Sequence, residues 1–107
     1  MGIGNNERAA FMYGGLKMNK TIVIGRLMEN PKRISDNNVV FYVANTTIKD
    51  GNEVMNCHRI LTLGRQAELA MQHLHKKDLC CIEGKLTKSE SGEISIAAEH
   101  ITFLCKK

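Results

Sequence analysis

Residues 56–70, "NCHRILTLGRQAELA", decide the fold, because they place a strand directly before a helix. Their first half belongs to a predicted strand over 53–63, "EVMNCHRILTL", and Gly64 ends that strand. The second half opens a helix of about three turns over 65–77, because its apolar residues recur on one helical face. The residues on that face are Ala67, Leu69, Ala70 and Leu74.

An earlier strand is predicted at the start of the patterned region. Residues 20–28, "KTIVIGRLM", alternate as a strand does, and Gly25 interrupts them where a bulge or tight bend lets a strand curl. Such curling suits a small barrel. Pro31 and the polar residues 35–38 then form a connection to the next strand.

The second strand is predicted over 39–48, "VVFYVANTTI", which is rich in β-branched and aromatic residues. The Asp-Gly pair at 50–51 is a strong hairpin signal, so this strand returns as the third strand over 53–63. Alternation along the second strand assigns Phe41 to the core and turns Tyr42 outward.

Two more strands follow the helix, over 78–88 and 93–104, around the short polar loop 89–92. Phe103 in the last strand is assigned to the core. The chain is therefore predicted to be all-β, with five strands and one helix between strands 3 and 4. Three strands, a helix and a hairpin make up the order of an OB-fold, a five-stranded barrel that commonly binds oligonucleotides.

Composition narrows the class of protein. The 107 residues suffice for about one domain, and 43% apolar with 24% charged residues is ordinary for a folded chain. The apolar runs are far shorter than the roughly 18 residues of a membrane span, and no signal-peptide pattern precedes them. We therefore expect a cytoplasmic protein without a membrane partner. The net charge of +4 favours an anionic partner, although lysines that only maintain solubility would explain it equally well.

Neither metal nor catalytic chemistry is expected. The four cysteines have no C-x-x-C spacing, and the adjacent pair at 80–81 would point to opposite faces of a strand, so buried thiols are predicted. The four histidines show no ligand pattern, so no cofactor is predicted. Paired carboxylates, a nucleophile with a base and a phosphate loop are not evident, so the protein is not expected to be an enzyme. The cysteines are Cys57, Cys80, Cys81 and Cys105, and the histidines are His58, His73, His75 and His100.

The first seventeen residues, "MGIGNNERAAFMYGGLK", show no sustained period and are followed by Met18. Their two adjacent glycine codons can contain GGAGG, a ribosome-binding sequence, shortly before an ATG at Met18. We therefore expect a flexible extension over 1–17, natural translation from Met18 and a barrel domain over 18–107; an intact mass of the native protein tests this. The alternative is a genuine arm whose arginine and tyrosine touch a ligand or partner.

Five short segments, in order and at the right spacing, carry a family resemblance. From Asn19 to Leu104 the chain resembles the bacterial and phage-type single-stranded DNA-binding protein family, and nearly the whole predicted core is covered. The segments are "NKTIVIGRLMENP" (19–31), "FYVAN" (41–45), "NCHRILTLGRQAELA" (56–70), "IEGKL" (82–86) and "AAEHITFL" (97–104).

The resemblance implies an OB-fold that binds single-stranded DNA without strong sequence preference, in replication, recombination or repair. It also implies a homotetramer, with a dimer as the alternative, located in the cytoplasm with the nucleoid. His58 resembles the family histidine at the subunit interface, so we expect it to contribute to assembly; a histidine satisfied on the barrel surface is the alternative.

The family binds DNA with the face of the third strand that carries Cys57, Arg59, Leu61 and Leu63. Cys57 and Leu63 stand where the family often has stacking aromatics, and the chain contains no tryptophan. Because each stacked base contributes roughly 1 to 3 kcal/mol, we expect binding to depend more on charge than on stacking. Tyr42 is the remaining candidate for stacking, and packing against a neighbouring subunit is its alternative role.

Basic residues border the same predicted face and are candidate phosphate contacts, although any one of them alone is as well explained as a solvated surface charge. They are Lys20, Arg26, Lys32, Arg33, Lys49, Arg59, Arg65, Lys85 and Lys88.

The chain ends at "FLCKK", whereas typical family members continue into an acidic tail that recruits other proteins. A short tailless member, or a member whose tail was removed, would fit. The length and the low aromatic content also resemble primosomal replication protein N, a tailless adaptor in replication restart. An RNA-binding OB-fold is a further alternative.

Overall fold

The computed structural model describes residues 19–89 and 91–105, so the predicted extension over 1–17 lies outside the described residues. Within this part of the chain, no helix is both long and apolar enough to cross a membrane. The elements, in chain order, are β1 (Thr21–Leu27), β2 (Lys32–Ser35), β3 (Asn38–Lys49), β4 (Asn52–Leu63), α2 (Gly64–His73), β5 (Leu79–Lys88) and β6 (Ile94–Cys105).

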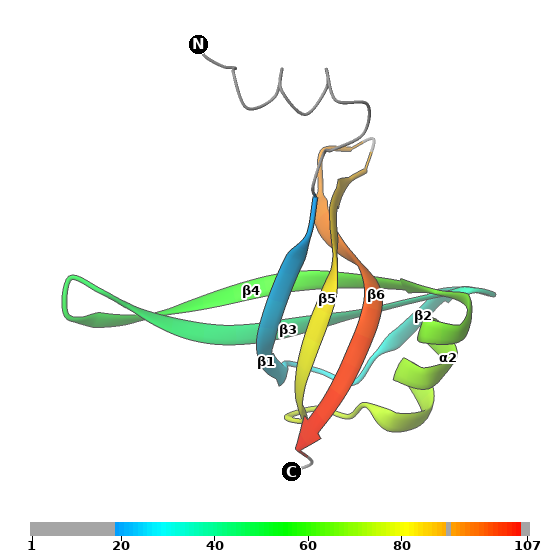
Figure 1. The fold of residues 1–107 in the computed structure, drawn as a ribbon, viewed down its shortest axis with the longest axis horizontal. Helices are drawn as coiled ribbons and strands as arrows, with labels where there is room; N and C mark the ends of the chain where they lie inside the picture. The colour runs from blue at the N-terminus through cyan, green and yellow to red at the C-terminus, as the bar shows by residue number, and fades with distance from the viewer. Residues whose placement is uncertain (1–18, 90, 106–107) are drawn as a thin grey trace.

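The strands form one sheet in the order β1-β5-β6-β4-β3-β2, which a further pairing of β1 with β3 closes into a barrel (Figure 1). β4 and β6 are parallel, and the other pairs are antiparallel. The prediction of an all-β, five-stranded OB-fold barrel with one helix is therefore confirmed. The helix follows β4, which is the predicted third strand.

The sequence did not predict β2. The stretch read as a plain connection contains a short strand that pairs with β3, where Lys32 lies opposite Val40 and Arg33 opposite Val39. Every residue of β2 is exposed, so no alternation of apolar and polar residues marks it. β2 lies at the edge of the sheet, outside the barrel, and its two cations are typical of a protected edge.

The barrel closes where β1 approaches β3, and Gly25 makes that approach possible. A Cβ at Gly25 would lie 2.4 Å from the carbonyl oxygen of Ala44, far inside van der Waals contact. The next residues of β1 then pair with β3, Arg26 with Ala44 and Leu27 with Val43. The glycine therefore permits close contact between two backbones, whereas the sequence suggested a bend or a bulge.

The core lies inside the barrel and under the helix. Ala67, Ala70 and Leu74 cover one end of the barrel and are buried, as predicted, whereas Leu69 of the same predicted face is only half-buried. α2 ends at His73, before the predicted end at 77, because Asp78 accepts a hydrogen bond from the backbone N–H of His75 (2.9 Å) and holds a turn. The buried apolar side chains that pack together as the core are Val23, Leu27, Val39, Phe41, Val43, Ile60, Ala67, Ala70, Leu74, Cys80, Ile82 and Ile96.

The assignment of Phe103 to the core is wrong. Its side chain is 40% exposed, and its ring contacts that of His73 at a centroid distance of 5.6 Å. Phe103 lies opposite Cys80, which faces the core, so alternation along β6 gives its side correctly. It is exposed because it lies near the end of β6, beside His73. Phe41, by contrast, is buried as predicted.

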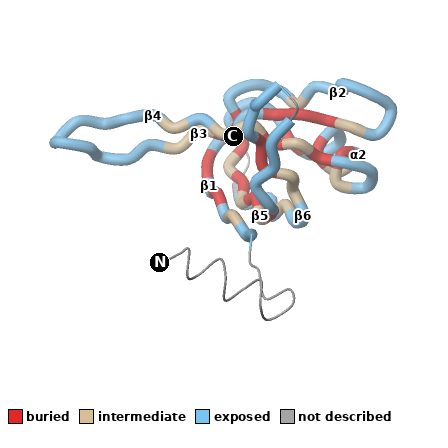
Figure 2. The backbone as a smooth tube through the Cα atoms, turned by 90° about the horizontal axis from the view of Figure 1, so that it is seen from above, coloured by how far each residue is buried: buried red, intermediate tan, exposed pale blue. Residues whose placement is uncertain are grey.

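The β3–β4 hairpin projects well beyond the barrel, to the left in Figure 1. Asp50 (φ 53°) and Gly51 (φ 80°) both adopt left-handed backbone at its tip, which confirms the Asp-Gly hairpin. The projecting part is exposed on all sides (Figure 2), so the core does not hold it in place. Asn56 stiffens its base by donating to Asn45 Oδ1 (3.4 Å) and Thr47 Oγ1 (3.3 Å).

Candidate nucleic-acid interface

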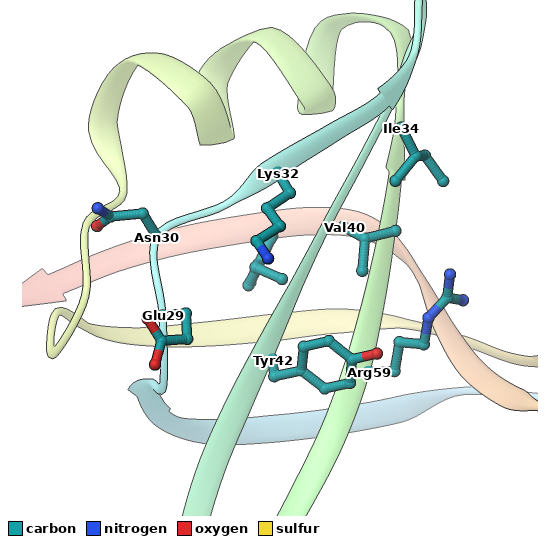
Figure 3. A pocket seen from close by; sticks show the side chains of 8 residues that line it. Glu29, Asn30, Lys32, Ile34, Val40, Tyr42 and Arg59 are labelled. Atoms are coloured by element: carbon teal, nitrogen blue, oxygen red, sulfur yellow. The ribbon is translucent and has the colours of Figure 1, made fainter.

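The outer face of β3 and β4 carries a pocket of about 310 Å³. Tyr42 and Arg59 are directly opposite each other in the β3–β4 register, so their side chains leave the barrel on the same side. β2 contributes Lys32 from across the pocket (Figure 3). The lining residues are Glu29, Asn30, Lys32, Ile34, Val40, Phe41, Tyr42 and Arg59.

Arg59 is held in place by β6 and by the loop before it. Its Nη1 donates to Ser95 Oγ at 2.6 Å, and its Nε lies 3.4 Å from Glu93 Oε2. A guanidinium has five N–H donors, so further donors are available to a phosphate. Glu93 nevertheless competes with any phosphate for this cation.

Tyr42 is exposed, as predicted, and its ring lies along the floor of the pocket between Glu29 and Arg59 (Figure 3). The amine of Lys32 points from β2 toward the strands of this floor. One aromatic ring and two cations of the predicted DNA-contacting set are thus brought together. Glu29 adds an opposing charge at the far side of the pocket, 4.0 Å from the ammonium of Lys76.

Three other predicted cations are ion-paired on the barrel surface. The ammonium of Lys20 lies 2.8 Å from Glu83 Oε2. The hydrogen bond and the charge of Glu83 raise the pKa of Lys20, and the same contacts lower the pKa of Glu83. Such exposed pairs exchange readily, so phosphates can compete for these cations at little cost. The other two pairs are Arg33 with Glu68 (3.1 Å) and Lys85 with Glu99 (3.7 Å).

The remaining predicted cations lie apart from the pocket lining. Arg26 donates to the carbonyl of Lys77 (3.0 Å) at one end of the barrel. Lys49 stands at the tip of the β3–β4 hairpin, Arg65 in the first turn of α2 and Lys88 at the end of β5. These four are exposed, and their contact with DNA stays a prediction.

The predicted buried thiol is wrong for Cys57 and right for Cys80. Cys57 is exposed on the same face as Arg59, two residues away along β4, and its Sγ lies 3.2 Å from Met28 Sδ. Cys80 faces the core, where burial raises the pKa of its thiol to about 12, and Cys81 turns outward and is half-buried. Leu63 is exposed at the start of α2, beyond the pocket.

The sequence profile of the Single-strand binding protein family matches residues 18–103. The chain belongs to the single-strand binding protein family. Among solved structures, it is similar to the small single-stranded DNA-binding protein from Streptomyces coelicolor. The two share 21% identity over 82% of this chain and 96% of that chain, with a TM-score of 0.68, which shows a common fold. No curated protein matches the chain.

Membership of the single-strand binding protein family identifies the ligand. The protein binds single-stranded DNA and acts through binding, not catalysis. Within residues 19–89 and 91–105, no group of three His, Cys, Asp or Glu side chains is placed to hold a metal ion.

His58, the residue predicted at the family's subunit interface, is half-buried and lies on the opposite face of β4 from Arg59. It lines a second pocket of about 280 Å³, together with the exposed apolar side chains of Leu86 and Ile94, and Cys57 and Arg59 also line this pocket. This surface lies where the β5–β6 hairpin leaves the barrel. Its role in assembly stays a prediction.

Two kinds of residue near the pocket were not predicted from the sequence. Ile34 lines the pocket of Tyr42 and Arg59 from β2, a strand without any burial pattern that could have signalled it. Met55 and Met28 lie on the same face as Cys57, and for Met55 the alternation along β4 was a usable signal. Methionine carries neither the positive charge nor the aromatic ring by which a DNA-contacting residue is recognised in a sequence.

Proposed function

We propose that this protein binds single-stranded DNA without strong sequence preference and protects it in the cytoplasm, at the nucleoid, during replication, recombination or repair. The convergence of Tyr42, Lys32 and Arg59 on one pocket carries this proposal. Lys32 and Arg59 pair with phosphates while Tyr42 stacks on a base, and both contacts are common to all four nucleotides.

Charge contributes most of the affinity in this proposal. The chain has no tryptophan, and Cys57 and Leu63 cannot stack as aromatic rings do. Each phosphate that is neutralised releases counterions, so the observed affinity falls as salt rises. A single copy therefore binds weakly, and a homotetramer or dimer supplies several faces to one strand.

A salt titration with fluorescent oligo-dT tests the proposal. Affinity should fall steeply from low to physiological salt, and Lys32→Glu should weaken binding at least tenfold at low salt because it places a negative charge in the pocket. Lys77→Glu is the matched control, since it changes the net charge equally but lies in the turn between α2 and β5.

Failure of the unaltered protein to bind oligo-dT at low salt would overturn the proposed function. Equal weakening by the two lysine variants would remove the pocket as the DNA site. RNA of equal length is a useful third ligand, because equal affinity for RNA and DNA would contradict a preference for DNA.

A further inference from the structure

A row of sulfur-containing side chains continues from the DNA-facing pocket onto the projecting hairpin. The β3–β4 register places Tyr42 opposite Arg59, then Ala44 opposite Cys57, then Thr46 opposite Met55. Alternate residues of a strand point to the same side, so these three pairs share the outer face. Successive pairs are roughly 7 Å apart along the strands.

Met28 joins this row from the bend that directly follows β1. Leu27, the last residue of β1, is buried in the core, whereas the side chain of Met28 is exposed. Its backbone N–H donates to the carbonyl of Tyr42 (2.9 Å), and its Sδ lies 3.2 Å from Cys57 Sγ. The small side chain of Ala44, opposite Cys57, leaves room for this contact. We call Met28, Cys57 and Met55 the sulfur track.

The side chains of the sulfur track are exposed to solvent. Met55 is 63% exposed and Met28 is 37% exposed, and Cys57 is exposed between them. Contiguous exposed apolar side chains mark binding surfaces in soluble proteins. Methionine is flexible and polarizable, contacts aromatic rings favourably and recurs on surfaces that accept varied partners.

We propose that the sulfur track contacts the bases of the bound strand, in place of the aromatic platforms that the chain lacks. Lys32 and Arg59 bind phosphates at the end of the track that lies next to the pocket. Beyond Tyr42, the sulfur atoms and methyl groups of the track contact successive bases. The inference rests on the proposed function, because it extends the path of the same strand from the pocket onto the hairpin.

Nucleobases fit this surface better than a protein does, because the track continues directly from the pocket of Tyr42, Lys32 and Arg59. The next pair outward on this face is Ile48 with Glu53. The carboxylate of Glu53 repels phosphate, so it defines the outer end of the track near Met55.

The test compares oligo-dT with an abasic oligomer of equal length, which keeps the phosphates but has no bases. The unaltered protein should prefer oligo-dT. Met28→Ala and Met55→Ala should each lower the affinity for oligo-dT by about two- to tenfold and leave the affinity for the abasic oligomer unchanged. Met71→Ala is the matched control, because Met71 is 38% exposed but lies on α2.

The variant Met55→Leu separates sulfur chemistry from simple apolar contact. It should recover part of the affinity for oligo-dT that Met55→Ala loses. Urea unfolding of each variant should show that the barrel is intact. Unchanged oligo-dT affinity in both track variants, or equal losses with oligo-dT and the abasic oligomer, would overturn the sulfur track while leaving the proposed function standing.

Two further outcomes are also decisive. A lower oligomer mass for Met55→Ala with an unchanged ratio of the two affinities would make the track a subunit contact and overturn its role with bases. An unaltered protein that binds neither oligomer would overturn the proposed function itself, and the sulfur track with it.

Discussion

At the scale of single residues, the ion pair of Arg59 with Glu93 bears on the proposed phosphate contact. The Nε of Arg59 lies 3.4 Å from Glu93 Oε2, so this carboxylate opposes a phosphate at the other donors of the same guanidinium. We predict that Glu93→Gln raises the affinity for oligo-dT about two- to fivefold at low salt, because it removes a surface ion pair of modest strength. Fluorescence anisotropy measures the change.

The control for Glu93→Gln is Asp36→Asn, which changes the net charge equally but lies in the turn between β2 and β3. A gain that is the same in both variants would attribute the effect to overall charge. An unchanged affinity for Glu93→Gln alone would show that Arg59 does not contact phosphate.

The sequence predicted residue orientations well wherever strands alternate simply. Tyr42 points outward, Phe41 inward, and Cys80 and Cys81 to opposite sides. The exposure of Phe103 was not predictable, because this residue lies opposite the core residue Cys80 but near the end of β6, beside His73. The ion-pair partners were not predictable either. Lys20 and Glu83, for example, are brought together only by the pairing of β1 with β5.

At the scale of elements, the strands with a buried face were predictable from local patterns and β2 was not. β3 and β4 alternate, and the Asp-Gly pair between them specifies a turn with left-handed backbone. β2 is stabilised by its pairing with β3 and buries no face, so only the folded arrangement of the chain defines it. Because β2 forms part of the pocket, the complete set of lining residues could not be predicted from the sequence.

The β3–β4 turn provides a prediction about the hairpin as a unit. Gly51→Val should destabilise the protein by about 1 to 2 kcal/mol, because a β-branched residue is strained at φ 80°. Urea unfolding measures the change, and amide exchange should accelerate first in the projecting part of the hairpin. Asp50→Asn is the control and should be nearly neutral, because asparagine tolerates left-handed backbone. Equal stability of the two variants would contradict the turn.

At the scale of the whole molecule, we expect one barrel to bind DNA weakly on its own. The pocket contains two of the predicted cations and one aromatic ring, and acidic neighbours oppose several of the other cations. Weak sites gain greatly when they are linked, because the second site then binds the same strand at a high effective concentration. We therefore predict that tight binding of long strands requires several copies of the chain acting together.

The surface around His58 leads to the corresponding prediction. Ile94→Glu places a charge on its exposed apolar rim and should dissociate the assembly, as light scattering would show. Ile94 lines this pocket together with Arg59, so the new charge should also weaken binding of a short oligo-dT, but the loss of affinity for one several times longer should be at least tenfold greater, because avidity is lost. Met71→Glu, on the exposed side of α2, should change neither property. The prediction would be contradicted if the unaltered protein had the mass of a single chain and still bound long strands tightly.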